Sequence, residues 1–243
     1  MITTREIADK TMTEEKRATA KLDLVAFYIG RPLSYYLTIP FLYTSISPNA
    51  ISLMSIIPIL IGFLLSCFLM SKTGMILSWC MFFLWNLLDG VDGNVARYKH
   101  QFSKFGSVYD AMAGYLAAAL TFFSAGIMAA HSTGILSSFI VIPREGLLIV
   151  GGLSALINMF PRLIMHKAAT TIGDIESVRE ISDKKEYSLL KVIALNLKSC
   201  TGGAQVLFLI SILTNALDVF TLFYFLFNSA VMLLSLRSIF KEK

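Results

Sequence analysis

The feature that most constrains this chain is a series of long apolar runs without charge. The clearest extends from Asn49 to Met70 and contains no Asp, Glu, Lys or Arg. A soluble amphipathic helix instead keeps its apolar residues on one face, so they occur in clusters of two or three. Only 15% of all residues are charged and 56% are hydrophobic, whereas soluble domains carry about 25% charged residues. The sequence therefore predicts an all-α integral membrane protein.

Six apolar runs are expected to cross the membrane, because each approaches the ~20 residues that a spanning helix needs. They cover residues 49–71, 74–97, 105–130, 146–166, 198–215 and 217–236. The fifth is the weakest, since Lys198 would have to extend its charge from the end of the span. Residues 47–243 thus form a six-helix domain, and residues 1–46 precede it as a cytoplasmic segment. Within that segment, 24–43 favours an amphipathic helix at the interface over a further span, because Arg31, Pro32 and Pro40 interrupt it.

The distribution of basic residues predicts the orientation. With the amino terminus inside, 19 of the 21 Lys and Arg residues fall on one side, and only Lys72 and Arg144 fall on the other. The positive-inside rule then places both termini in the cytoplasm. Residues 168–190 are polar and are expected to be a cytoplasmic connection with some helix. The net charge of +5 flanks apolar runs, which favours membrane lipids or anionic substrates as partners over nucleic acid.

Three aspartates lie at the cytoplasmic ends of the second and third predicted spans. Asp89 and Asp92 are three residues apart and share a helical face, and Asp110 enters from the next helix. A carboxylate at the edge of a membrane is a functional hypothesis by default. Three hard oxygen ligands without His or Cys suit Mg²⁺ or Mn²⁺ rather than zinc. The alternative is an ordinary belt of salt bridges with the basic residues of the connection, Arg97, Lys99 and Lys104.

The residues around these acids match a known signature. The run from Asp89 to Arg97, DGVDGNVAR, is followed by eight residues, Gly106, three residues and Asp110. It resembles the signature of the CDP-alcohol phosphatidyltransferase family. That signature reads DxxDGxxAR, then eight residues, G, three residues, D, three residues and a last D. Seven of the eight fixed positions match, with every gap intact. The element SPNAIS before the first span, which contains Asn49, is similar to a further motif of that family.

The resemblance implies a six-helix membrane enzyme that transfers a substituted phosphate group from a CDP-linked donor to a lipid or alcohol acceptor and releases CMP. It implies that Asp89, Asp92 and Asp110 hold two divalent ions, Mg²⁺ or Mn²⁺, against the diphosphate. It further implies nucleotide-binding roles for Asn49, Gly93, Ala96, Arg97 and Gly106. The cavity between the helices would face the cytoplasm, and the products would be phospholipids or lipid-linked glycoconjugates. Dimers are common in families of this kind.

One fixed position departs from the signature. The family's last aspartate, usually assigned as the base and as a ligand of the second metal, falls at Gly114. Four explanations stay open: an inactivating substitution, a natural pseudoenzyme acting as a scaffold, replacement of the base by a water or another carboxylate, or an acceptor that is already an anion. A polyprenyl phosphate, for example, could attack the donor without a base. General-base catalysis contributes about 10²- to 10⁴-fold, so its loss need not abolish turnover.

Two further cations are candidates for binding the phosphate or the acceptor. Arg162 lies near the cytoplasmic end of the fourth predicted span, and Lys104 lies between the two acidic helices. Each can instead contact lipid headgroups as an ordinary topogenic residue. A transporter with a carboxylate ion site is the competing functional class. The acids lie at a membrane face rather than at its midplane, which disfavours transport.

Overall fold

The computed structural model describes residues 2–172 and 189–241, and every regular element within these ranges is a helix. The α-helices are α1 (Thr4–Thr11), α2 (Glu14–Ala20), α3 (Arg31–Leu42), α4 (Pro48–Phe68), α5 (Lys72–Tyr98), α6 (Gly106–Ala130), α7 (Arg144–Ile172), α9 (Leu189–Lys198), α10 (Gly203–Leu213) and α11 (Leu217–Lys241). A π-helical turn, η1 (Ala26–Gly30), leads into α3, and a 3-10 turn, η2 (Leu136–Ser138), follows α6. The predicted all-α membrane fold is confirmed.

Five of these helices are long and apolar enough to cross a membrane: α4, α5, α6, α7 and α11. They correspond to the first four predicted spans and the sixth. The fifth predicted span is different, because residues 191–213 form two helices that bend by 62° at a short break. The expectation of one helix over 198–215 is therefore wrong in detail. A sixth span exists only if the bent pair of α9 and α10 crosses as one.

Two glycines explain the break between α9 and α10. A Cβ atom on Gly202 would overlap the carboxylate of Asp23, and one on Gly203 would overlap the backbone carbonyl of Asn196. Asp23 is bound at this point by the Ser199 hydroxyl, which donates to its Oδ2 at 2.5 Å. The chain therefore turns where the distant segment around Asp23 packs against it, and only glycine leaves enough space for this contact.

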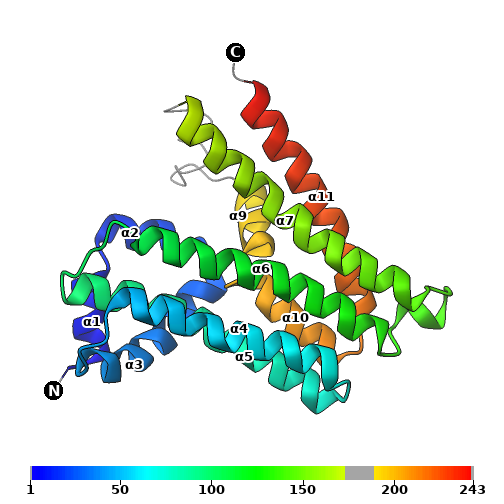
Figure 1. Cartoon of the computed structure of the whole chain (residues 1–243), viewed down its shortest axis with the longest axis horizontal. Helices are drawn as coiled ribbons and strands as arrows, with labels where there is room; N and C mark the ends of the chain where they lie inside the picture. The colour runs from blue at the N-terminus through cyan, green and yellow to red at the C-terminus, as the bar shows by residue number, and fades with distance from the viewer. Residues whose placement is uncertain (1, 173–188, 242–243) are drawn as a thin grey trace.

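Among the long helices, α4 packs on α5 and α6, and α7 packs on α6 and α11. In Figure 1, α4 and α5 lie side by side beneath α6, and α7 and α11 cross above α6 and diverge from it towards their C-terminal ends. Aromatic side chains fill the centre, with Phe82, Phe122, Phe208 and Tyr224 at most 2% exposed. Gly126 of α6 and Gly151 of α7 meet there, since a Cβ on Gly126 would lie 2.7 Å from the Gly151 Cα. Small residues that allow such close approach are typical of helix packing in membranes.

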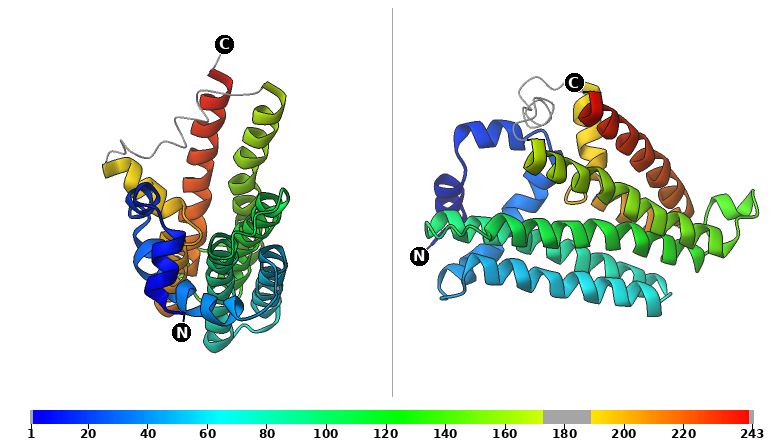
Figure 2. Two further views of the ribbon diagram at one scale, coloured as in Figure 1. Left: turned by 90° about the vertical axis from the view of Figure 1, so that its left-hand side faces the viewer. Right: turned by 45° about the horizontal axis from the view of Figure 1, so that its top comes forward.

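The residues before α4 gather at one end of the bundle, where α5 ends and α6 begins (Figures 1 and 2). The helix expected at 24–43 is present as η1 and α3, and α3 packs against α5. Its predicted place at the membrane interface remains a prediction. Of the predicted cytoplasmic connection, α7 extends to Ile172, and 173–188 lie outside the described residues.

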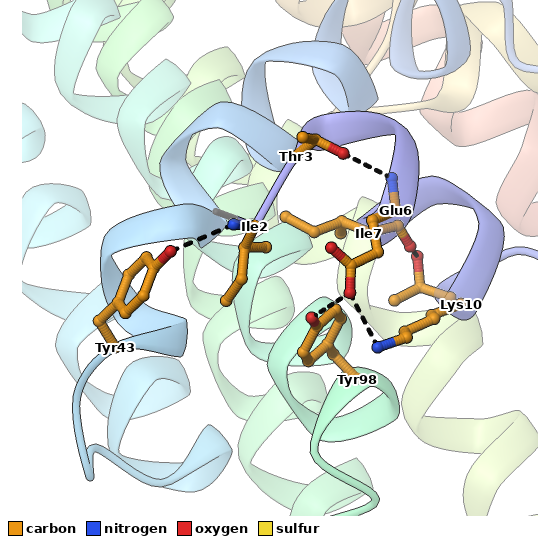
Figure 3. Close-up of polar contacts among 8 residues, drawn as sticks. Ile2, Thr3, Glu6, Ile7, Lys10, Tyr43 and Tyr98 are labelled. Atoms are coloured by element: carbon orange, nitrogen blue, oxygen red, sulfur yellow. Dashed lines mark hydrogen bonds and ion pairs between the residues drawn. The ribbon is translucent and has the colours of Figure 1, made fainter.

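Residues 2–25, here called the N-terminal arm, dock on this end of the bundle through α1 (Figure 3). Glu6 accepts hydrogen bonds from the Tyr98 hydroxyl at 2.6 Å and from Lys10 Nζ at 2.9 Å. Ile7 is fully buried in an apolar cluster at the junction of α1, α3, α4 and α5. The backbone N–H of Ile2 donates to the Tyr43 hydroxyl at 3.1 Å. The arm is therefore a packed element of the fold.

Candidate active site

A cavity opens at the end of the bundle that the N-terminal arm covers. Its volume is about 430 Å³. The walls come from α2, η1 and α3 on one side and from α4, α5 and α6 on the other. All three candidate metal ligands and all five candidate nucleotide-binding residues line it: Asp89, Asp92, Asp110, Asn49, Gly93, Ala96, Arg97 and Gly106. Folding thus gathers both sets in one cavity.

The three aspartates converge from two helices. The Asp89 carboxyl lies against that of Asp110 and near that of Asp92. Asp92 is 7% exposed and accepts a hydrogen bond from the Ser52 hydroxyl of α4. Burying carboxylates close together is unfavourable unless a cation or a proton compensates them.

The alternative of a salt-bridge belt is not supported. Among the described residues, none of the three aspartates forms an ion pair with Arg97, Lys99 or Lys104. Lys99 instead donates to the carbonyl oxygens of Phe41 at 3.3 Å and Thr44 at 2.7 Å, and so binds the end of α3. Among the described residues, the acids thus face the cavity without an ion-pair partner.

The three aspartates are oxygen ligands of the kind that a divalent ion binds. Asp89 and Asp110 present facing carboxylates from two helices, and hard oxygen donors are the ligands of Mg²⁺ and Mn²⁺. In the part of the chain that the structure describes, however, no three acidic, His or Cys side chains converge as a complete ligand set. Asp92 lines the same cavity, and its Oδ2 accepts the hydrogen bond from Ser52. Its other carboxylate oxygen can complete the set while this contact is kept.

The signature glycines have distinct structural roles. A Cβ on Gly93 would lie 2.8 Å from Arg97 Nη2, so Gly93 makes room for the guanidinium. A Cβ on Gly90 would lie 2.8 Å from the Cβ of Ser34, so Gly90 allows α3 to approach α5. At Gly106 the nearest atom would be Asn49 Oδ1 at 3.7 Å, an ordinary contact. Gly90 is thus required by packing, a Cβ on Gly93 would have to displace the flexible end of the Arg97 side chain, and Gly106 is open to the cavity.

Several polar residues of the cavity were not predicted from the sequence. Asn94 is 3% exposed and donates to Thr38 Oγ1 at 3.2 Å and Ser34 Oγ at 3.4 Å, and its Oδ1 accepts from Arg97 Nη2 at 3.4 Å. This network connects α3 to the signature arginine. The spacing of Ser34 and Thr38, four residues apart on one helical face, was the only local signal.

Two basic residues, and one residue of the break between α9 and α10, were also not predicted. Lys16 of α2 and Arg31 of α3 line the cavity. Thr201 lines it from the break between α9 and α10, where its carbonyl accepts from Asn86 Nδ2 at 2.8 Å. None of the three lies near the signature in sequence.

A second cavity adjoins the first. It has a volume of about 260 Å³ and is lined by Gly114, Tyr115 and Arg162 among others. Asp89, Asp110 and Thr201 line both cavities. The two acids therefore stand between a larger chamber at the N-terminal arm and a smaller one at α7. Lys104 is exposed and lines neither cavity.

Gly114 leaves open space in the second cavity. A Cβ at this position would have no neighbouring atom within 4 Å. The Arg162 guanidinium lies 5.9 Å from the centre of the Tyr115 ring, one residue further along α6. An unfilled volume thus adjoins Gly114, in a cavity that Arg162 also lines.

Comparison with known proteins agrees with this geometry. No curated protein matches the chain. The family model of the CDP-alcohol phosphatidyltransferases matches residues 45–177, which contain the three aspartates and the helices α4, α5, α6 and α7. This family transfers phosphate-linked groups from CDP-alcohols and is generally dependent on divalent metals. Because the match covers more than half of its length, the chain belongs to the CDP-alcohol phosphatidyltransferase family.

Proposed function

We propose that this protein transfers a substituted phosphate group from CDP-diacylglycerol or a soluble CDP-alcohol to an acceptor in the membrane, with release of CMP. The observation that carries the proposal is the position of Asp89 and Asp110 on the wall shared by two cavities. A group-transfer enzyme needs a donor site and an acceptor site that meet at the reacting phosphorus. The larger cavity suits the nucleotide donor, and the smaller one suits the acceptor.

In this proposal the donor's cytidine and diphosphate occupy the larger cavity. Asn49, Gly106 and Ala96 line its wall, and Arg97 provides positive charge. Asp89, Asp92 and Asp110 would hold divalent ions, which supply charge neutralisation of the phosphates and of the departing CMP. The carboxylates themselves position these charges, because α5 and α6 hold them on two rigid backbones.

The transfer forms one bond to phosphorus and breaks another. An acceptor oxygen forms a bond to the β-phosphorus, the bond from that phosphorus to the bridging oxygen breaks, and CMP leaves with the electron pair. A hydroxyl acceptor also loses a proton, and at Gly114 there is no carboxylate to receive it. For a hydroxyl acceptor, a water or the leaving phosphate would then accept the proton.

A second candidate acceptor is an anionic phosphate, which needs no base. The open space at Gly114 and the presence of Arg162 in the same cavity favour it. A phosphate oxygen is already deprotonated, and arginine binds phosphate well because its planar fork can donate two hydrogen bonds. The product would be a diphosphate-linked lipid, for example from a polyprenyl phosphate.

The domain and its orientation belong to the same proposal. Residues 47–243 would form the catalytic domain, with both termini and both cavities on the cytoplasmic side. The bias of 19 of 21 basic residues supports this orientation. The ends of α5 and α7 and the starts of α4 and α6 then share that side.

CMP release tests the proposal directly. The full chain in lipid nanodiscs is incubated with a panel of CDP-linked donors, Mg²⁺ or Mn²⁺, and either hydroxyl or phosphate acceptors, with Asp92→Asn as the control. Donor-dependent CMP release that the control loses supports transfer. Saturable, metal-dependent CDP binding without release would indicate a silent scaffold, and the absence of both would refute the assignment. Transfer only to hydroxyl acceptors, increased by Gly114→Asp, would refute the phosphate acceptor.

A further inference from the structure

Three cations line the larger cavity together with the acids. Lys16 comes from α2, Arg31 from the first turn of α3 and Arg97 from the last turns of α5. Within the described ranges, none of them forms an ion pair with a carboxylate. Burial, together with repulsion from Arg97 and Arg31, lowers the pKa of Lys16 to about 8. The fold therefore holds three like charges in one cavity, and Arg97 is attracted by Asp92 and Asp110 without forming an ion pair with either.

The hydrogen-bonding capacity of these cations is also incompletely used. Arg97 Nε is buried and has no partner, and Nη2 reaches only Asn94 Oδ1 at 3.4 Å. Arg31 Nη1 approaches the sulfur of Met12 at 4.0 Å, a weak acceptor. A buried donor without an acceptor costs about 1–3 kcal/mol. An anion in the cavity would satisfy these donors.

Lys16 is held over the cavity by contacts on both sides of α2. Before it, α1 docks through Glu6 on Tyr98. After it, Asn196 Nδ2 donates to the Leu22 carbonyl at 2.7 Å, and the Leu24 N–H donates to Asn196 Oδ1 at 2.9 Å. These contacts hold the segment between Glu6 and Leu24 to the bundle at two points.

We propose that Lys16, Arg31 and Arg97 form a phosphate-binding site, and that the N-terminal arm thereby completes the substrate cavity. The proposal rests on the proposed function, because that function supplies the phosphate. The site has no acidic member, so it recognises phosphate without an intervening metal. The phosphate belongs either to the diphosphate of the donor or to a separate anion, such as a phosphate acceptor.

Binding to purified variants tests the site. The full chain in nanodiscs of neutral lipid with Mg²⁺ is titrated calorimetrically with CDP, with cytidine, and with inorganic phosphate after saturation with CDP. The variants are Lys16→Gln and Arg31→Gln, and Lys16→Arg retains the charge. Arg17→Gln is the matched control, because Arg17 is the next residue of α2, is exposed and does not line the cavity.

If the donor diphosphate is the ligand, Lys16→Gln and Arg31→Gln each weaken CDP binding roughly tenfold. Cytidine affinity then stays within twofold, and Lys16→Arg and the control behave as wild type. If a separate anion is the ligand, CDP binding is unchanged and inorganic phosphate binding to the CDP-saturated protein is lost instead.

Wild-type affinities for both CDP and phosphate in Lys16→Gln and Arg31→Gln would overturn the phosphate site while leaving the proposed function intact. Failure of the proposed function would give a different binding result. The wild-type chain would then bind inorganic phosphate through Lys16 and Arg31 but no CDP. Binding of neither ligand by wild type would refute both.

Discussion

Shortening Ile7 to Ala should release the N-terminal arm from the bundle. Ile7 is fully buried although it lies on a helix of only eight residues. Its side chain is the one apolar group of α1 that is completely enclosed, among Tyr35, Leu42, Ile51, Val91 and Val95. The docking of the arm therefore depends strongly on this residue.

The expected cost follows from the carbons removed. Ile→Ala deletes three carbon atoms, worth about 0.8 kcal/mol each when buried, and leaves a space that the neighbours fill only in part. Because α1 is short and lies at the surface, it can settle into this space. We therefore expect about 2–3 kcal/mol, at the low end for such substitutions. This corresponds to a roughly 30- to 150-fold larger population of the undocked arm.

Hydrogen–deuterium exchange of the full chain in nanodiscs measures that population. The amides of α1 should exchange roughly 30- to 150-fold faster in Ile7→Ala, because they exchange when the arm opens. Arg5→Ala, at an exposed position of the same helix, is the control. Tyr98→Phe removes only the hydroxyl that binds Glu6 and should have a smaller effect. Protection in Ile7→Ala within threefold of wild type would show that the buried cluster does not hold the arm.

Three further perturbations test the site and its surroundings. If the Lys16 ammonium binds phosphate, CDP affinity should fall as the pH rises through about 8, where Lys16 loses its proton. Lys16→Gln should lack this fall, and identical titration profiles in the two proteins would contradict the reasoning. Gly202→Ala should lower the melting temperature, since its Cβ meets Asp23 and overpacking costs about 1–3 kcal/mol. Gly146→Ala, where the nearest atom is 3.9 Å away, is the control that should not lower it. Gly114→Asp should fold as stably as wild type, because the position is open. It should also increase CMP release with hydroxyl acceptors, by up to about 100-fold if the new carboxylate acts as a base. A lower melting temperature or an unchanged rate would count against this.

Properties that depend on local pattern were predictable. Apolar runs of sufficient length identified five of the spanning helices, because a bilayer demands the same length and hydrophobicity of every span. The signature spacing located Asp89, Asp92 and Asp110, since residues on one helix and its neighbour keep their relative positions when the helices form a hairpin. The identity of the family followed from the same run of residues.

Packing between distant segments determined the features that the sequence did not predict. The fifth span breaks because Asp23 packs against Gly202 and binds Ser199, 176 positions away from it in sequence. Lys16 lines the cavity only because the arm is held at both ends, and no motif precedes it. Hydrophobicity and helical spacing are properties of neighbouring residues, so the chain alone determined a membrane fold and an acidic cluster. Which cations face that cluster, and which open volume lies beside Gly114, depends on contacts between distant segments, and only the tertiary structure decided it.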